Sequence, residues 1–298
     1  MSITVVGSVA LDTVETPAGR NEEGLGGAAT YFSLAAIHYA PVNLVGVVGD
    51  DFPEEHIVLF QKQGINIEGL ERAPGKTFRW EGRYHDDINE RDTLETQLNV
   101  FEHFHPKLPE AAQKAEYLFL GNIHPSLQLE VLEQATPKFT ILDTMNLWIE
   151  IAQDDLRRVL TRLDAIVIND SEVKLLTGRS NLIKGAREIA AMGPRIVVVK
   201  KGEHGCLLFM DDEIFVAPAF PLDEVLDPTG AGDTFAGGFL GYLAQKDSIN
   251  PASLRQAVIH GSVVASFACQ DFGPASLVSL TNEAIAERYK RFQALVRF

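Results

Sequence analysis

Residues 227–244 read DPTGAGDTFAGGFLGYLA, in which three small residues at 230–232 stand directly before an acid, Asp233. Apolar residues then recur at helical spacing, which predicts a helix that begins near Thr229 or Gly230. These apolar residues are Phe235, Phe239, Leu240 and Leu243. Small residues let this helix pack closely against a neighbour: they are Ala236, Gly237, Gly238 and Gly241.

The stretch before this helix has two interpretations. In the first, it is a glycine-rich turn with an acid that stabilises the first helical turn. In the second, backbone N–H groups at the positive end of the helix hold a phosphoryl group, and Asp233 accepts the proton of a hydroxyl that attacks the phosphorus. The N–H groups would be those of Gly230, Ala231 and Gly232. The spacing alone leaves both interpretations open.

Continuously apolar, β-branched runs alternate with helix-like segments along the chain. We expect strands at 3–11, 42–49, 115–122, 138–144, 164–169 and 195–201, and helices at 27–39, 53–64, 125–135, 153–162, 170–177 and 181–192. Such runs are typical of strands that are buried on both faces of a parallel sheet. The order therefore predicts an α/β fold with a doubly wound, mostly parallel sheet, in which ligands bind beyond the carboxyl ends of the strands.

Residues 76–101 interrupt this order with two alternating runs around the polar tip HDDINERD. One face would carry Phe78, Trp80, Gly82 and Tyr84, and another would carry Leu94, Thr96, Leu98 and Val100. We expect a hairpin that forms a small inserted β lid together with the polar loop at 13–25; an exposed, ornamental hairpin is the alternative. The chain would be a single domain, 1–298, with lid elements at about 12–25 and 76–101.

The composition narrows the class of partner. A net charge of −15 and a pI of about 4.9 argue against nucleic acid and anionic membranes, which need a basic surface. Two cysteines, Cys206 and Cys269, exclude a disulfide scaffold. The N-terminus has no signal-peptide pattern, and no apolar run approaches the length of a membrane span, so we expect a cytoplasmic protein.

Four motifs, in order, resemble those of the ribokinase-like (PfkB) carbohydrate kinases. They are GLGGAATYFSLAA (24–36), INDSEVKLLTG (168–178), KKGEHGC (200–206) and DPTGAGD (227–233). The resemblance extends across the chain and implies a kinase that uses ATP and Mg²⁺ to phosphorylate a hydroxymethyl group of a sugar, as ribokinase or fructokinase does. A nucleoside or cyclic-polyol kinase of the same family is the alternative. The resemblance also implies that Asp233 is the catalytic base and that 230–232 form the anion hole.

Asn169 and Glu172 have two expected roles. The N-x-x-E spacing before an apolar helix is a capping box. The resemblance implies that Glu172, with Asn169 nearby, also orients the hydrated Mg²⁺, and a single carboxylate suffices because Mg²⁺ usually keeps several waters. Both roles can coexist.

The resemblance places the nucleotide at two segments. Lys201, Gly202 and Gly205 follow a strand, where a plain β-turn with a solvated lysine is the alternative. His260 and Gly261 would complete the adenine side, although a lone histidine on a helix is more often a surface or core residue.

The acceptor site is expected at the other end of the chain. Asp12 follows the first strand, and by resemblance its carboxylate holds substrate hydroxyls while Gly26 and Gly27 let backbone and lid approach the substrate. The alternative for Asp12 is an exposed acid after a strand. Many relatives carry Asn where this chain has Thr30, so the identity of the substrate stays open.

Some members of the family bind a monovalent cation beside the anion hole, which here would be K⁺ at Asp227 and Thr229 with a loop at about 265–276. A strand-end acid and an N-cap threonine are the alternative. We also expect the lid to pair with that of a second subunit as a homodimer.

Two rival functions remain. Residues 24–29 fit the G-x-G-x-x-A pattern of dinucleotide-binding oxidoreductases. Their context does not fit that class of protein, because a polar loop instead of a strand precedes them, and no acidic residue stands at the end of a second strand about twenty residues later. A non-catalytic sugar-binding protein on a kinase-like fold is the other rival, and Asp233 argues against it because binding alone needs no base.

Overall fold

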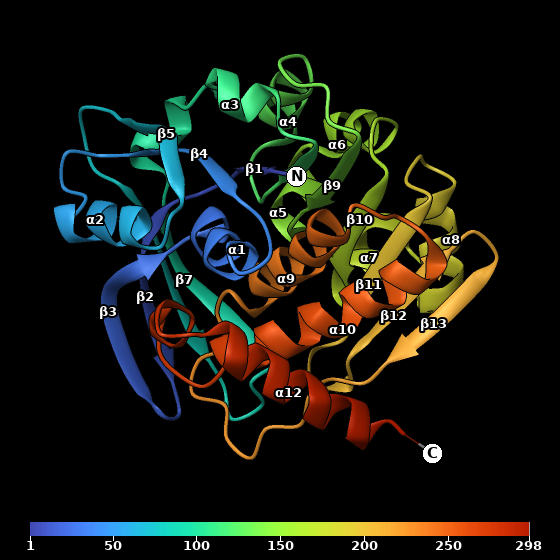
Figure 1. The fold of residues 1–298 in the computed structure, drawn as a ribbon. Helices are drawn as coiled ribbons and strands as arrows, with labels where there is room; N and C mark the ends of the chain where they lie inside the picture. Colours follow the sequence, from blue (N-terminus) through green and yellow to red (C-terminus); the bar gives the residue numbers. More distant parts are fainter. Residues whose placement is uncertain (298) are drawn as a thin grey trace.

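The structure is a computed structural model that describes residues 1–297. Within these residues, a central sheet has the strand order β13-β12-β11-β10-β9-β8-β1-β4-β5 (Figure 1). Its strands are β1 (Ile3–Val6), β4 (Val42–Val48), β5 (Asn66–Arg72), β8 (Tyr117–Leu120), β9 (Phe139–Asp143), β10 (Ala165–Asn169), β11 (Ile196–Lys200), β12 (Cys206–Met210) and β13 (Glu213–Ala217). Within this central sheet of residues 1–297, only the pairs β11–β12 and β12–β13 are antiparallel. The predicted fold class is confirmed.

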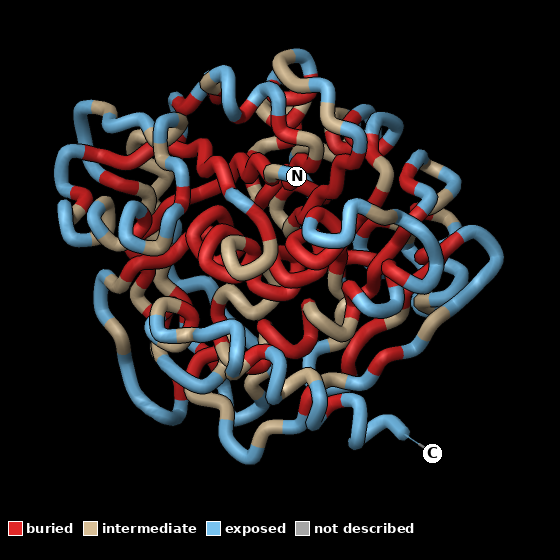
Figure 2. The backbone as a smooth tube through the Cα atoms, viewed as in Figure 1, coloured by how far each residue is buried: buried red, intermediate tan, exposed pale blue. Residues whose placement is uncertain are grey.

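Helices cover both faces of the sheet, and each face has its own apolar core (Figure 1). Buried residues fill the centre of the molecule (Figure 2). The first layer contains α1 (Ala28–Ala36), α2 (Glu54–Lys62), α9 (Ala231–Lys246), α10 (Pro251–Ala268), α11 (Ala275–Val278) and α12 (Asn282–Leu295). The second contains α3 (Glu110–Gln113), α4 (Pro125–Leu132), α5 (Asn146–Ile151), α6 (Gln153–Leu160), α7 (Asp170–Thr177), α8 (Leu182–Ala190) and the 3₁₀ turn η1 (Asn99–His103). No helix in residues 1–297 has the length and apolarity that crossing a bilayer requires.

The predicted strand 3–11 is two strands in the structure. β1 ends at Val6, and β2 (Ala10–Thr16) belongs to a different sheet. Ser8 interrupts the strand because its backbone carbonyl and its hydroxyl accept the N–H groups of Ala29 and Ala28 at the start of α1, both at 3.0 Å. The break therefore anchors the first helix.

The other predicted strands contain β4, β8, β9, β10 and β11, whereas β5, β12 and β13 were not predicted. β5 is a partly exposed strand at the sheet edge with the polar sequence NIEGLER. β12 and β13 form an antiparallel hairpin at the opposite edge, and an α/β alternation contains no such hairpin. Edge strands escape a search for continuously apolar runs because only part of their surface is buried.

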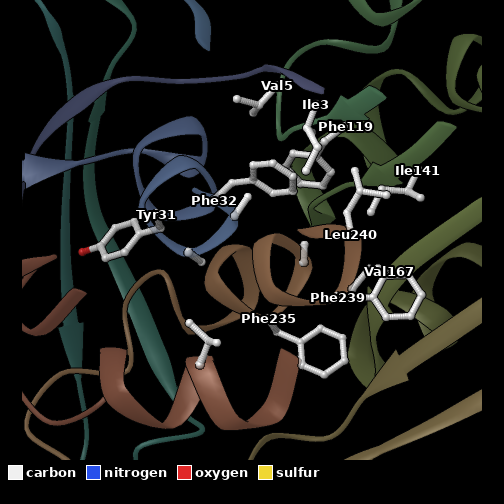
Figure 3. Packing of buried hydrophobic residues seen from close by; sticks show 14 of the residues in the cluster. Ile3, Val5, Tyr31, Phe32, Phe119, Ile141, Val167, Phe235, Phe239 and Leu240 are labelled. Atoms are coloured by element: carbon white, nitrogen blue, oxygen red, sulfur yellow. The ribbon is translucent and has the colours of Figure 1, made fainter. Parts of the chain in front are cut away.

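The glycine-rich helix α9 packs as the small residues predict. A β-carbon on Gly237 would lie 2.5 Å from the carbonyl oxygen of Phe32 in α1, and one on Gly238 would lie 3.1 Å from the Cα of Gly261 in α10. The helix begins at Ala231 with Gly230 as its N-cap, one residue from the expected start. Among the labelled residues of α9, Leu240 lies nearest the stacked rings of Phe32 and Phe119, whereas Phe235 and Phe239 point away from them (Figure 3).

A second, small sheet has the order β3-β2-β6-β7, with β3 (Gly19–Gly26), β6 (Phe78–Tyr84) and β7 (Arg91–Gln97). β2 and β3 lie to one side of the helices around α1, and β7 lies beside them (Figure 1). The expected hairpin and its pairing with the segment after β1 are both present. The polar segment 13–25 is therefore mostly strand, because it pairs within this sheet.

One face of the hairpin differs from the prediction. As expected, β6 contains Phe78, Trp80, Gly82 and Tyr84. The other strand is shorter than predicted, because β7 ends at Gln97, before Leu98 and Val100. The register shifts opposite Glu81 and Gly82, which leaves Leu94 without a partner and 45% exposed. After a bulge, the side chains of the strand point to the opposite faces of the sheet. The alternation of apolar and polar residues in the sequence does not reveal where a bulge lies.

The topology predicts that a ligand binds beside β1. The chain runs from β1 to β4 and β5 on one side and returns to β8 on the other side. Ligands in open α/β sheets bind at such a switch point, outside the carboxyl ends of the strands. The small sheet starts there, because β2 follows β1 after three residues.

Candidate active site

The carboxyl ends of three neighbouring strands bring charged side chains together. Asp143 ends β9, Asn169 ends β10, and Lys200 ends β11, where it lies opposite Asn169 in the register. The Nζ of Lys200 donates to Oδ2 of Asp143 at 3.0 Å, and the pair is largely buried. Burial alone would lower the pKa of Lys200, but the carboxylates of Asp143, Glu172 and Asp233 raise it above its ordinary value.

Asp233 lies in the first turn of α9, close enough to this pair for their charges to act on its carboxyl. Burial raises the pKa of Asp233 to about 7; the charge of Asp143 adds to that increase, and Lys200 opposes it. A carboxylate with a pKa near neutral is suited to accept a proton at physiological pH. The environment of Asp233 is thus compatible with the role of base, which stays a prediction.

Glu172 and Asn169 form the predicted capping box. Asn169 Oδ1 accepts the backbone N–H of Glu172 at 2.8 Å, and Glu172 Oε2 accepts that of Asn169 at 2.9 Å. No hydrogen bond from residues 1–297 reaches the other oxygen, Oε1. Burial raises the pKa of Glu172 to about 7, with Asp143 adding to the effect.

The loop before α9 is shaped by close contacts. Gly230 has a φ of 72°, and a β-carbon there would lie 2.3 Å from Cγ of Tyr31, so glycine is required for two reasons. Tyr31 and its neighbour Phe32 point to opposite sides of α1 (Figure 3). The N–H of Ala231 donates to Pro228 at 3.2 Å, whereas those of Gly230 and Gly232 have no acceptor within residues 1–297. Two of the three predicted donors thus remain for an anion.

Asp12 lies on β2 and is 7% exposed. A β-carbon on Gly26 would lie 2.0 Å from its Oδ2, and its Oδ1 is buried without a hydrogen-bond partner in residues 1–297. Burial raises the pKa of Asp12 to about 7; a backbone hydrogen bond from Gly27 opposes this, and the charges of Asp227 and Asp233 add to it. Asp12 is therefore close enough to Asp233 for their charges to interact, and the two predicted residues belong to one region of the structure.

Thr30 makes a hydrogen bond within the protein. Its side chain is fully buried, and its hydroxyl donates to the carbonyl of Gly26 at 2.7 Å. This bond supports the glycine pair. The direct substrate contact expected of Thr30 has no support from this geometry.

The predicted nucleotide loop connects β11 to β12. Gly202 and Gly205 both have positive φ, 53° and 80°, and Lys201 donates its N–H to the carbonyl of Gly205 at 2.8 Å. A β-carbon on Gly202 would lie 2.3 Å from Oδ1 of Asn89, at the tip of the β6–β7 hairpin. The small sheet thus reaches this loop.

His260 lies in an aromatic cluster. Its ring stacks between Tyr242 and Tyr289, with centroids 4.2 and 4.5 Å away, and its Nδ1 lies 3.0 Å from the hydroxyl of Tyr39. A β-carbon on the next residue, Gly261, would lie 2.8 Å from the carbonyl of Phe235, so that glycine allows α9 and α10 to pack. These contacts explain both residues within the fold, and their contact with a nucleotide stays a prediction.

Asp227 is buried between two loops. It accepts the N–H of Thr229 at 2.8 Å and that of Gly273 at 3.0 Å, and burial raises its pKa. The predicted loop 265–276 therefore does meet this segment. Thr229 is not the N-cap of α9, which is Gly230, and its hydroxyl donates to that of Tyr84 at 3.2 Å. A monovalent cation here stays a prediction.

Four residues near these side chains escaped prediction: Asp143, Lys200, Tyr31, and Arg91, whose charge acts on the carboxyls of Asp12, Glu172 and Asp233. Asp143 and Lys200 end buried strands, and a charged residue in that position was the one signal that could have identified them. Tyr31 and Arg91 have no such signal, because α1 and β7 contain them as ordinary helix and strand residues.

The donor set fits a hydrated Mg²⁺ with a nucleotide. No group of three or more His, Cys, Asp or Glu side chains in residues 1–297 forms a protein-only metal cage. Mg²⁺ is usually bound by one or two carboxylates, with waters and substrate phosphates completing its shell. Glu172 with its remaining oxygen, and the unpaired N–H groups of the loop before α9, agree with that arrangement.

Comparisons with known proteins give the family. Residues 2–281 match the pfkB family of carbohydrate kinases. The chain is 32% identical over 246 residues to a cytidine kinase from Thermococcus kodakarensis, a match that covers 80% of this chain and 87% of that protein.

Solved structures share the fold. A nucleoside kinase of Burkholderia thailandensis in complex with inosine superimposes with a TM-score of 0.80 and 20% identity, covering 98% of this chain and 99% of that one. A putative ribokinase II from E. coli, in complex with ATP and Mg²⁺, has a TM-score of 0.80 and 18% identity, covering 97% and 99%. The oxidoreductase interpretation of residues 24–29 is therefore wrong. The chain belongs to the pfkB family of carbohydrate kinases, and it is a phosphotransferase that acts on a hydroxyl group.

Proposed function

We propose that this protein transfers the terminal phosphoryl group of MgATP to the 5′-hydroxymethyl group of a ribonucleoside. The observation that carries the proposal is the unpaired, buried Oδ1 of Asp12, in the same site as Asp233. A buried carboxylate oxygen without a donor is costly, and a ribose diol supplies the missing hydrogen bonds. The sequence favoured a sugar as the acceptor; the likeness to a cytidine kinase over most of the chain now favours a nucleoside.

The chemistry assigned to the residues is an in-line displacement. Asp233 accepts the proton of the acceptor hydroxyl while the hydroxyl oxygen forms a bond to phosphorus and the bond from phosphorus to the ADP oxygen breaks. The N–H groups of Gly230 and Gly232 stabilise the charge on the transferred group. Glu172, with Asn169 nearby, would hold the hydrated Mg²⁺, and the ion would supply positive charge that neutralises the phosphates.

An ADP-release assay over a panel of acceptors tests the proposal. We expect turnover with ribonucleosides such as cytidine and inosine, and none with their 5′-deoxy analogues, which lack the attacking hydroxyl. The 2′,3′-dideoxy analogues should bind poorly, because they lack the diol that Asp12 holds. Free ribose or fructose as the best acceptor would make the protein a sugar kinase. Binding of these ligands without any ADP release would support the non-catalytic rival.

A further inference from the structure

Arg91, the first residue of β7, is an exposed residue on the edge strand of the small sheet. Arg91 pairs with Tyr84 across β6–β7, and Trp80 pairs with Asp12 across β2–β6. Directly paired residues share a face of a sheet, and so do residues two or four apart on one strand. Arg91 therefore lies on the same face as Asp12, although 79 positions separate them in the sequence.

The guanidinium of Arg91 is positioned by an aromatic ring. Its Cζ lies 5.1 Å from the centroid of the Trp80 ring, a cation–π contact. The indole extends across Gly82, where a β-carbon would lie 2.1 Å from its Cη2, and its N–H donates to the hydroxyl of Thr93 at 3.4 Å. Gly82 and Thr93 thus set the orientation of the ring that Arg91 faces.

The end of the hairpin spans the two loops that the nucleotide would contact. Tyr84, the partner of Arg91, bonds the hydroxyl of Thr229, which lies next to Gly230 before α9. Asn89, two residues before Arg91, lies against Gly202 in the β11–β12 loop. Arg91 is therefore in the segment that connects the loop before α9, next to the predicted catalytic base, with the predicted nucleotide loop between β11 and β12.

Among the described residues, Arg91 has no ion-pair partner although the site is rich in carboxylates. Five carboxylates gather there, and the lysine among them is already paired with Asp143. They belong to Asp12, Asp143, Glu172, Asp227 and Asp233. No carboxylate in residues 1–297 lies within ion-pair distance of Arg91. Its charge nevertheless acts on the carboxyls of Asp12, Glu172 and Asp233, where it opposes the effect of burial.

An anionic nucleotide that enters among these acids needs a cation that is not already neutralised. A guanidinium suits this task because its planar fork donates two parallel hydrogen bonds to phosphate oxygens. Lys200 cannot fill the role alone, since Asp143 holds it.

We propose that Arg91 binds the transferred phosphoryl group and stabilises the charge on its oxygens during transfer, with Trp80 as the residue that positions it. The inference rests on the proposed kinase reaction, and it adds a donor from the small sheet to the N–H groups of Gly230 and Gly232. Arg91 gives up no proton in the step; Asp233 accepts the only proton that moves.

Kinetics of Arg91→Gln, with Arg83→Gln as a matched control, test the proposal. Arg83 is a neighbour on β6 that pairs with Glu15 on the outer face. We expect kcat of Arg91→Gln to fall by roughly 10²–10³-fold, the scale of losing one donor to a transition-state oxygen. The KM for the acceptor should change little, and Arg91→Lys should recover part of kcat. The control should stay within about twofold of the parent. A kcat of Arg91→Gln within about threefold of the parent would overturn the proposal.

Nucleotide binding supplies a readout that needs no acceptor. With Mg²⁺ present, a non-hydrolysable ATP analogue should raise the Tm of the parent more than ADP does, since it adds the contact with the terminal phosphoryl group. In Arg91→Gln this extra shift should disappear while the ADP shift remains. An unchanged extra shift, or an equal loss for both nucleotides, would refute the contact. This result is independent of which acceptor the panel identifies, so a failure of the nucleoside proposal can be distinguished from a failure of this one.

A double-mutant cycle tests the role of Trp80. Trp80→Leu should lower kcat by roughly 10-fold in the parent, but it should have no further effect in Arg91→Gln, because coupled residues do not act additively. Equal effects in both backgrounds would show that Trp80 acts only on the stability of the small sheet.

Discussion

The Oδ2 of Asp12 lies 2.0 Å from the point that a β-carbon on Gly26 would occupy, so the two residues fit together only because glycine has no side chain. The two residues are diagonal neighbours on adjacent strands of the small sheet, where Gly26 pairs with Ala10 and Asp12 pairs with Gly24. The glycine pair and the acid are thus one feature, in which bare backbone leaves room for a carboxylate and for the ligand that it holds.

The first prediction follows from this contact. Asp12→Ala should raise the KM for the acceptor by roughly 10–100-fold, because a buried diol loses its hydrogen-bond partner. The KM for ATP should not change. Gly26→Ala should have the same effect, since its β-carbon would displace the carboxylate. If Asp12→Ala has no effect with the best acceptor of the panel, the acceptor site lies elsewhere.

The second prediction concerns Asp233→Asn, which keeps the shape of the side chain and removes the base. Turnover should fall by roughly 10²–10⁴-fold, the usual scale for a positioned general base, with nucleotide binding little changed. Initial rates and calorimetric titration with ADP measure the two quantities. Near-normal turnover would contradict the assigned mechanism.

The third prediction concerns pH. The pKa of Asp233 rises from 3.8 to about 7 on folding, so the folded chain binds more protons than the unfolded chain between these values. The contribution of this group to stability is therefore complete below about pH 4 and is lost as pH rises through about 7, whereas activity rises over the same range. Asp233→Asn should have a higher Tm than the parent at pH 8, and the difference should shrink at pH 5.

The exposed carboxylate of Asp212 supplies the control for that measurement. Asp212→Asn should shift the Tm little at either pH. A Tm of Asp233→Asn below that of the parent at pH 8 would contradict the prediction. It would mean that neighbouring groups stabilise the ionised carboxylate by more than its burial costs.

The fourth prediction separates the two roles of Glu172. Gln retains an oxygen that can accept the N–H of Asn169, so Glu172→Gln keeps the cap and removes the charge. The variant should need much more Mg²⁺ for half-maximal rate. Its Tm should not fall, and at pH 8 it should rise as in Asp233→Asn, because burial raises the pKa of Glu172 to about 7 and Gln removes the buried charge. As a control, Asn181→Ala removes another N-cap, at α8, and should cost about 0.5–2 kcal/mol of stability with an unchanged Mg²⁺ response. An unchanged Mg²⁺ requirement in Glu172→Gln would leave capping as its only role.

The fifth prediction concerns the hairpin. β7 is an edge strand with almost all of its residues exposed, and we expect it to cover the acceptor and to pair with the same strand of a second copy. Replacing residues 85–90 by an Asn-Gly turn should raise the acceptor KM by at least about 10-fold. Light scattering should show a dimer for the parent and a monomer for Leu94→Lys, which places a charge at the exposed bulge. A monomeric parent whose shortened variant keeps its acceptor affinity would contradict both roles.

Local interactions explain what could be predicted from the sequence. The capping box of Asn169 and Glu172 and the helix that carries Asp233 depend on contacts within a few residues, and apolar runs mark strands that are buried on both faces. The motifs with glycine could be recognised because a positive φ or a close approach excludes other residues there, as at Gly230.

Long-range packing decided the rest. The pairing of Lys200 with Asp143 depends on which strands are neighbours in the sheet, and the position of Arg91 depends on the register of β7 and on a bulge that alternation does not reveal. The raised pKa of Asp233 results from burial among other acids, which no single segment contains. The sequence by itself determined the elements and the motif residues, because short-range sterics and hydrogen bonds specify them. The tertiary structure alone determined the electrostatics of the site, because charges interact through space between residues that are far apart in the chain.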